Sequence, residues 1–330
     1  VPEIGVSFHV GLDGLSFPMV LLTCLLAVVA LLASMGPDKP RGKGYFAWFL
    51  AMEVAILGVF VAQDWFLFYV FWELALIPMF FLIGVWGDEK RGAASMAFFL
   101  YTLAGSILML VGMMAAYLAT PEHSFDMSVV AQAHSGWSSE FQIFVFCLFF
   151  AGMAVKLPVV PLHGWLPMAH VQAPVPVSMM LSGVLLKMGA YGMLRLLDLA
   201  PAGAQWATNL LFGAGLVSIV YGAFMAWKQD DLKAMVAYSS ISHMGFVLVG
   251  IASLSEIGLS GAMTQMFVHG IITAALFMLV GVIYENAHSR KLSELAGAAR
   301  GAPRYMTLLT MTLLAAIGLP GLAGFVGEFH

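Results

Sequence analysis

The segment QIFVFCLFFAGMAVKLPVVPLHGWL, residues 142–166, has a single charged side chain, Lys156, in a run long enough to cross a bilayer. A transmembrane helix needs about 20 mainly apolar residues. Pro158 and Pro161 follow the lysine and interrupt helical hydrogen bonding. A break at membrane depth is tolerated only where protein or water satisfies the freed backbone groups. The segment therefore predicts a membrane-spanning helix that is broken inside the protein beside a buried lysine.

The composition of the whole chain agrees with a membrane protein. Of its 330 residues, 61% are hydrophobic and 10% are charged, whereas soluble domains average about 25% charged residues. The net charge of −4 and the lack of any basic run argue against nucleic acid as a partner. Cys24 and Cys147 form no paired motif, and no flavin, haem or iron–sulfur motif occurs. We therefore expect no cofactor and no metal on this chain.

Further apolar runs of near-spanning length are separated by short polar loops. None shows the alternation of a β-barrel strand, which argues against that alternative. The runs predict an all-α, polytopic membrane protein with about ten transmembrane helices. They lie at 17–33, 46–63, 64–86, 95–119, 142–166, 170–197, 207–227, 236–253, 262–285 and 305–328.

Lysine and arginine residues gather in alternate loops. With ten crossings, four basic loops fall on one side, which the positive-inside rule assigns to the cytoplasm or its organellar equivalent. The loops at 120–140 and 254–261 hold no lysine or arginine, and Arg195 is the exception near that opposite side. Asp13 and Asp64 lie near span ends, where a solvated or capping role is expected. The basic loops contain Lys39, Arg41 and Lys43; Lys90 and Arg91; Lys228 and Lys233; and Arg290, Lys291, Arg300 and Arg304.

Three ionisable residues lie well inside predicted spans: Glu73, Lys156 and Lys187. A charge at the centre of a transmembrane helix costs about 2.5–3.5 kcal/mol on insertion scales, and such residues usually serve a function. Tyr191 follows Lys187 at i+4 and is placed to hydrogen-bond it. The alternatives are a Lys156 that snorkels to an interface and a protonated, structural Glu73. We favour a function in ion transfer, in which a carboxylate and an amine pair in one state and part in another.

Histidines extend this set. His243 and His269 occupy two later spans, where they can relay protons or serve as satisfied core residues. His163 and His170 flank the sequence Gly-Trp-Leu-Pro after the proline break, where proton conduction competes with a structural role in the loop. A second expected break, Leu319-Pro320-Gly321, precedes Glu328. Glu53, inside the 46–63 span, has a functional and a structural interpretation that are equally open.

One pattern of ionisable residues occurs twice in the chain. Glu73 precedes Lys156 by 83 residues, and His243 precedes Glu328 by 85 residues. Each pair links an early helix to a Leu-Pro break. Units at about 46–197 and 207–330 start on opposite sides and correspond to five helices each, the second being truncated, which predicts an inverted repeat. The whole of 1–330 is expected to form a single transmembrane domain of an incomplete chain.

Five stretches of the sequence resemble one known family. They are Phe68–Pro78 (FYVFWELALIP), Val155–Pro167 (VKLPVVPLHGWLP), Gly183–Gly192 (GVLLKMGAYG), Ala237–Phe246 (AYSSISHMGF) and Leu319–Phe329 (LPGLAGFVGEF). Together they look like the antiporter-like subunits of respiratory complex I, NADH:quinone oxidoreductase, a family shared with Mrp-type antiporters. Glu328 favours the subunit M, or mitochondrial chain-4, type, because the sister subunits tend to carry lysine there. Met168 departs from the aspartate usual in the Leu-Pro-x-Ala-His motif.

The resemblance implies a fourteen-helix subunit of which the first two and last two helices are not in this sequence. It also implies a proton channel in which Glu73 pairs with Lys156, and Lys187 connects through His243 and His269 to Glu328. His163 is a further candidate. FMN, iron–sulfur clusters and quinone are then expected on partner subunits and not on this chain. The expected partners are other antiporter-like subunits of the membrane arm and the peripheral arm of complex I. The membrane is expected to be a bacterial inner membrane, with the mitochondrial inner or thylakoid membrane as alternatives.

Two rival functions share these features. A subunit of an Mrp-type Na⁺/H⁺ antiporter or of a membrane-bound hydrogenase would carry the same lysines. A structural membrane scaffold would leave the cost of the buried charges unexplained. Co-purification with NADH-oxidising subunits would favour complex I over the first rival. A Lys187→Ala variant that assembles and functions normally would favour the structural scaffold.

Overall fold

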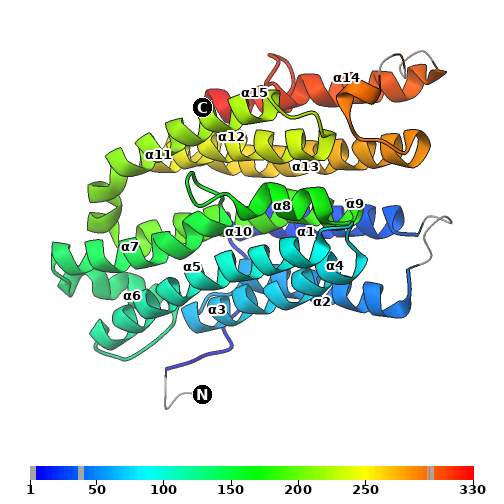
Figure 1. Ribbon diagram of the computed structural model, residues 1–330. Coiled ribbons are helices and arrows are strands. Elements are labelled where there is room, and N and C mark those ends of the chain that lie inside the picture. The colour runs from blue at the N-terminus through cyan, green and yellow to red at the C-terminus, as the bar shows by residue number, and fades with distance from the viewer. Residues whose placement is uncertain (1–4, 36–40, 296, 298–300) are drawn as a thin grey trace.

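The computed structural model describes residues 5–35, 41–295, 297 and 301–330, and its long helices run roughly parallel and antiparallel to one another (Figure 1). The all-helical prediction is confirmed. The helices are α1 (Ser16–Ala33), α2 (Lys43–Val61), α3 (Trp65–Leu74), α4 (Leu76–Trp86), α5 (Arg91–Ala119), α6 (Met127–Ala133), α7 (Ser139–Lys156), α8 (Trp165–Gln172), α9 (Val175–Met180), α10 (Leu186–Leu199), α11 (Pro201–Trp227), α12 (Leu232–Ala252), α13 (Glu256–Ala287), α14 (Pro303–Ala316) and α15 (Ala323–Phe329).

Nine helices in the described residues are long and apolar enough to cross a membrane. The predicted tenth span, 305–328, is instead two pieces, α14 and α15, separated by Leu319-Pro320-Gly321. Gly318 and Gly321 have φ values of +67° and +97°, which favour glycine and allow the chain to turn there. The second break is therefore present, and it replaces one helix by two short ones.

The predicted helices at 142–166 and 170–197 need correction. Helix α7 ends at Lys156, irregular chain follows to Gly164, and the short α8 precedes the next span. That span comprises α9, a π-helical turn at Leu181–Leu185, and α10, and it is buried throughout its middle. The prolines end α7 because they cannot donate the helical hydrogen bond. Lys187 therefore lies near the middle of the most central helix in the bundle, with α1 and α13 beside it.

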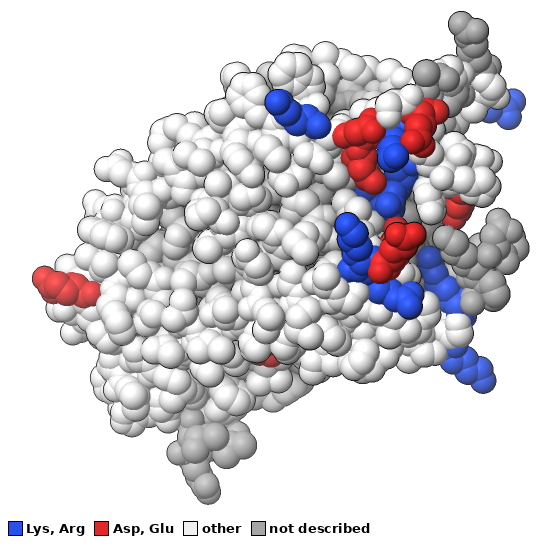
Figure 2. Space-filling view, in the orientation of Figure 1, with Lys and Arg blue, Asp and Glu red and all other residues white. Residues whose placement is uncertain are grey.

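The basic loops meet at one end of the bundle. Figure 2 shows lysine, arginine and acidic side chains gathered at that end, with a broad uncharged belt beside them. Arg290 Nη1 donates to Asp88 Oδ2 at 2.8 Å and to the carbonyl of Val171, and Arg290 Nε lies 3.3 Å from Asp231 Oδ2. Three loops far apart in sequence thus share one side, as predicted. Of the predicted basic residues, Lys39 and Arg300 lie outside the described residues.

At the opposite end of the bundle, Asp13 and Asp64 accept hydrogen bonds from N–H groups at the starts of helices, as expected for carboxylates at span ends. Asp64 accepts hydrogen bonds from the N–H groups of Phe66 and Leu67 and so caps α3. Asp13 accepts from the N–H groups of Leu15 and Ser16 and lies 2.5 Å from Arg195 Nη2. A cap of this kind satisfies N–H groups that the first helical turn leaves without partners.

We expect Arg290→Ala to destabilise the basic end without disturbing the transmembrane core. The change leaves Asp88 and Asp231 without their shared guanidinium and removes a donor from the Val171 carbonyl. Because these groups are partly exposed, the loss should be about 1–2 kcal/mol. The midpoint of thermal unfolding in detergent measures it. Arg304→Ala is the control, since Arg304 is exposed on α14 and has no partner in the described part of the chain; an equal effect of both changes would contradict this role.

Candidate functional site

The proline break after α7 is satisfied by protein groups. The indole Nε1 of Trp165 donates to the carbonyl of Val155 at 2.8 Å, and the N–H of Val159 donates to the carbonyl of Ala154 at 2.9 Å. The N–H of Val160 donates to Ser218 Oγ at 3.1 Å. Groups that the prolines free from the helix therefore find partners in the interior, which allows non-helical chain at membrane depth.

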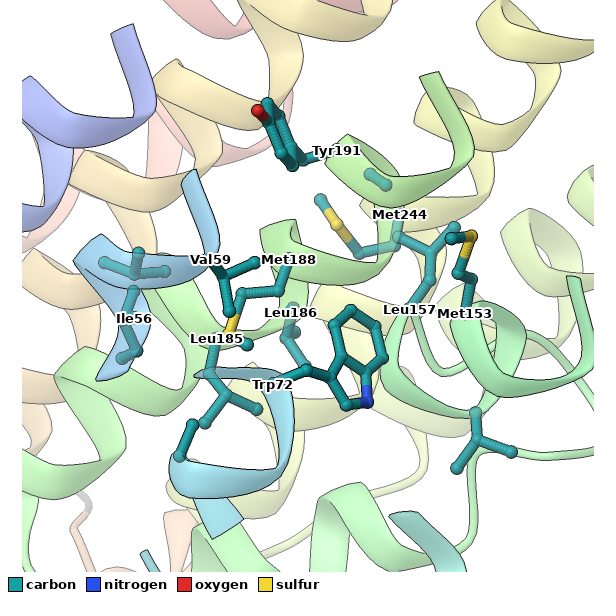
Figure 3. Close-up of a cluster of buried hydrophobic side chains, with 14 of the residues drawn as sticks. Ile56, Val59, Trp72, Met153, Leu157, Leu185, Leu186, Met188, Tyr191 and Met244 are labelled. Atoms are coloured by element: carbon teal, nitrogen blue, oxygen red, sulfur yellow. The ribbon is translucent and has the colours of Figure 1, made fainter. Parts of the chain in front are cut away.

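Lys156 is buried at this break, with 1% of its surface exposed. Its Nζ has no hydrogen-bond partner among the described residues and lies 4.7 Å from the centre of the Trp72 ring. An amine over an indole face gains a cation–π interaction. Figure 3 shows Trp72 set among apolar side chains, with Leu157 and Leu186 near it. The nearest contact of the amine is therefore aromatic, and Glu73 acts on it through charge and not through a hydrogen bond.

Glu73 and Lys156 are not in ion-pair contact in this structure, and the pairing that the family resemblance implies stays a prediction. Trp72 faces the amine, and the next residue along α3 points about 100° away around the helix. Glu73 Oε1 is buried and has no hydrogen-bond partner among the described residues. Both groups thus stand near one another without a bond between them.

Lys187, on α10, is completely buried and has two contacts. Its Nζ donates to the carbonyl of Ser182 at 2.5 Å and lies 2.7 Å from His269 Nδ1. Ser182 belongs to the π-helical turn, a local irregularity often found at functional sites. The amine therefore joins the central helix to α13.

The expected bond between Lys187 and Tyr191 is wrong. The Tyr191 hydroxyl donates to the carbonyl of Phe60 at 3.0 Å and accepts from Arg195 Nε at 3.0 Å. Side chains on a helix lean toward its N-terminus, so Lys187 turns back to Ser182 while Tyr191 is held by groups near the other end of the span.

A line of polar side chains continues from Lys187. The rings of His269 and His243 have centroids 5.4 Å apart, and His243 Nδ1 lies 2.7 Å from Glu328 Oε1. The same Glu328 oxygen accepts from Gln265 Nε2 at 3.1 Å. Helices α10, α13, α12 and α15 each contribute at least one member. The structure therefore brings together Lys187, His269, His243 and Glu328, but His269, not His243, is the histidine next to Lys187, so the two histidines stand in the reverse of the order that the resemblance implies.

A small cavity accompanies this line. It measures about 10 Å³ and is lined by Ser239, His243, Gln265, His269 and Glu328 among others. A space of about 10–15 Å³ with several polar partners is just enough for one water molecule. The cavity beside the two imidazole rings thus has room for about one water molecule, which could bridge them.

Two polar residues of the interior are hard to find from the sequence alone. Gln265 is not among the predicted site residues, and His170 is predicted only as a loop residue after the proline break. Gln265 precedes His269 by one turn of α13, so their helical spacing is a usable signal. His170 is fully buried, its ring stacks on Phe277 at 4.6 Å, and neither ring nitrogen has a hydrogen-bond partner in the described chain. His163 lies apart, 9% exposed, with its ring 4.9 Å from that of Tyr221.

Lys233 is another correction, because the sequence places it among the loop residues. It lies in α12, is 3% exposed, and donates to the carbonyl of Ala173 at 2.7 Å. Met168, the departure from the family motif, is 46% exposed on α8. Over the described ranges, no three histidine, cysteine or acidic side chains converge as metal ligands.

Most of the chain, residues 62–330, matches the family model described as "NADH:quinone oxidoreductase/Mrp antiporter, TM". The chain belongs to this family. It is therefore an integral membrane protein.

Relatives within the NADH:quinone oxidoreductase/Mrp antiporter family cover nearly the whole chain. NADH-quinone oxidoreductase subunit M of Rickettsia bellii is 41% identical over 99% of this chain and 66% of its own length. Subunit M of Rhodobacter capsulatus is 44% identical over 99% and 65%, and NAD(P)H-quinone oxidoreductase chain 4 1 of a Synechococcus strain is 44% identical over 99% and 62%. The chain thus spans slightly less than two thirds of the length of these relatives.

Solved structures of family members share the fold. A chain of respiratory complex I from Thermus thermophilus superimposes with a TM-score of 0.90 and 34% identity, over 100% of this chain and 69% of that one. A chain of the Mrp complex from a Dietzia species gives 0.86 and 26%, over 99% and 36%. Both belong to multi-subunit membrane complexes, and the likeness to the complex I chain is the greater in sequence.

Proposed function

We propose that this chain is subunit M, a proton-translocating membrane-arm subunit of an NADH:quinone oxidoreductase. The observation that carries the proposal is the line Lys187–His269–His243–Glu328, whose first two members are buried and whose two direct contacts measure 2.7 Å. Heavy-atom distances of about 2.6–3.2 Å suit proton transfer. The likeness to subunit M and chain 4 proteins supports the choice of complex.

Each member of the line can take up one proton and release it. An amine, two imidazoles and a carboxyl group alternate as donor and acceptor, and one water molecule in the small cavity would bridge the two imidazoles, so a proton can move from Lys187 to Glu328 without any other group on this chain. Electron transfer would occur elsewhere. FMN, iron–sulfur clusters and quinone are assigned to partner subunits of the peripheral arm and its junction with the membrane.

Glu73 and Lys156 form the proposed switch at the other end. When a charge shift in a neighbouring subunit moves Glu73 toward Lys156, the amine exchanges its aromatic contact with Trp72 for a carboxylate. Such an ion pair favours the protonated lysine, and its separation favours release of the proton. The separated arrangement, with the amine over Trp72, is the one found here.

Lys156→Ala tests the proposal in the assembled complex. We expect NADH:quinone reduction coupled to proton uptake to fall about tenfold or more, because general acid–base groups contribute factors of about 10²–10⁴. Proton pumping by the complex in proteoliposomes, followed with a pH-sensitive dye, is the measurement. Cys147→Ser on the same helix is the control. Wild-type pumping by the alanine variant would refute the role of Lys156.

The inverted repeat is part of this proposal. The units of about 46–197 and 207–330 each contain a helix broken at a Leu-Pro sequence. The first break lies between α7 and α8, and the second lies between α14 and α15. Each break lies beside an ionisable residue, Lys156 and Glu328 respectively. Related breaks near the midplane are common where transporters bind their ions.

A subunit of an Mrp-type antiporter is the second candidate, favoured by the Mrp complex superposition; a membrane-bound hydrogenase shares the same lysines. Isolation of the native complex decides between them: NADH-oxidising subunits accompany the chain in the first case. Sodium-dependent proton exchange without NADH indicates an antiporter. A purely structural scaffold predicts normal ion transfer after replacement of the buried lysines.

A further inference from the structure

Glu53 is a carboxylate at the middle of a membrane span that the proton path does not use. It lies ten residues after Lys43 and eight before Val61, the two ends of α2. At 1.5 Å per residue, the nearer end is about 12 Å away along the helix axis. A glutamate side chain is too short to reach the headgroups from there, unlike lysine or arginine.

Glu53 lies at the edge between the buried and the exposed sides of α2. It is partly exposed and lies at helical spacing from Leu50 and Leu57 on one side and from the buried Phe49 and Ile56 on the other. Leu50 and Val54 are 48% and 58% exposed. The buried stripe of the same helix faces the core and includes Phe49, Met52 and Ile56. The stripe beside it, named the Glu53 face, consists of the exposed Leu50 and Val54 and the partly exposed Glu53 and Leu57.

Glu53 has no hydrogen bond or ion pair with any described residue. Two other ionisable groups inside spans, Lys156 and Lys187, are buried within the bundle, and Glu73, partly exposed like Glu53, has its Oε1 atom buried. Ionisable groups inside a membrane almost always face protein or a water-filled space, and pair with a group of opposite charge. A lipid-facing carboxylate would be an exception to that rule.

We propose that the Glu53 face is an intramembrane docking surface for a neighbouring transmembrane subunit, which presents a lysine, arginine or histidine opposite Glu53. A cation is favoured over a hydroxyl or amide because only a cation neutralises the carboxylate in an apolar layer. The apolar residues of the face would pack around the pair and exclude lipid. That a neighbouring subunit exists rests on the proposed function, whereas the basic side chain that it presents is inferred from Glu53.

Labelling with N,N′-dicyclohexylcarbodiimide tests the proposal on the native complex, because this reagent reacts with protonated carboxyl groups in apolar surroundings. We expect Glu53 to stay unlabelled in the intact complex and to become labelled after detergent removes the neighbouring subunits. Mass spectrometry of the peptide that contains Glu53 is the readout. Labelling of Glu53 in the intact complex would overturn the inference, because the group would then be protonated and open to lipid.

Site-specific cross-linking identifies the occupant. A benzophenone attached to Glu53→Cys, with Cys24 and Cys147 replaced by serine, should capture a different polypeptide of the complex. Capture of lipid alone, or of this chain's own polypeptide, would contradict docking by another subunit.

Glu53→Gln keeps the shape and removes the charge. We expect about tenfold or greater loss of the neighbouring subunit during detergent purification, since removal of one partner from a desolvated charge pair raises the dissociation rate. Glu256→Gln, the same change at an exposed position in the first turn of α13, is the matched control. Retention equal to that of wild type in both variants would refute the pairing. If no other membrane subunit purifies with the wild-type chain, the proposed function fails instead.

Discussion

Replacing Lys187 with methionine should abolish proton pumping while the complex still assembles. Methionine fills nearly the same volume as the lysine stem, so the buried packing around α10 should survive. The variant loses the amine that contacts both Ser182 and His269. Among the described residues, no other side chain hydrogen-bonds His269 Nδ1, so nothing takes over the role of the amine. We expect pumping to fall to about a tenth or less, as for removal of a general acid–base group.

The measurement for Lys187→Met is the number of protons moved per NADH oxidised in proteoliposomes, together with the amount of assembled complex. Lys228→Met is the matched control, because Lys228 is an exposed lysine at the end of α11 on the same chain. A Lys187→Met complex that pumps as well as the control would remove Lys187 from the path and favour a scaffold.

Replacing Gly189 with leucine should prevent stable assembly. Even a Cβ atom at this position would lie 2.7 Å from the backbone nitrogen of Leu157 and 2.8 Å from the carbonyl oxygen of Met153. Both are backbone atoms beside the break that holds Lys156, so α10 would have to move away from α7. Overpacking of this kind costs about 1–3 kcal/mol or more, and a backbone clash belongs at the upper end.

The amount of folded subunit after membrane extraction, measured by fluorescence-detected size exclusion, checks the Gly189→Leu prediction. Gly213→Leu is the control, since a Cβ there meets nothing within 4 Å on the exposed side of α11. We expect normal amounts for that variant. Equal recovery of both variants would show that the close approach of α10 and α7 tolerates a side chain.

The two changes separate chemistry from architecture. Lys187→Met removes a proton-carrying group from an intact bundle, whereas Gly189→Leu separates the helices that hold Lys187 and Lys156. Loss of function in the first with normal assembly, and loss of assembly in the second, would locate ion transfer in the buried side chains themselves.

Local properties of the sequence were enough to predict most of the spans, the shared side of the basic loops and the burial of Lys156 and Lys187. Hydrophobicity and charge act on each segment by itself, because every span must match the bilayer and every basic loop responds to the same positive-inside rule. The break after Lys156 was also predictable, since proline removes a donor wherever it stands. The family resemblance added the members of the line, Lys187, His243, His269 and Glu328, whereas the structure decided that His269 is the one next to Lys187.

Only the tertiary structure decided what each buried group touches. The indole of Trp72 lies beside Lys156, the π-helical turn presents the Ser182 carbonyl to Lys187, and Gln265 joins Glu328. Lys233 is buried although it follows a loop. These contacts depend on how far each helix is rotated about its axis and on which faces meet. Packing of many side chains from distant segments sets both, and no single segment contains that information.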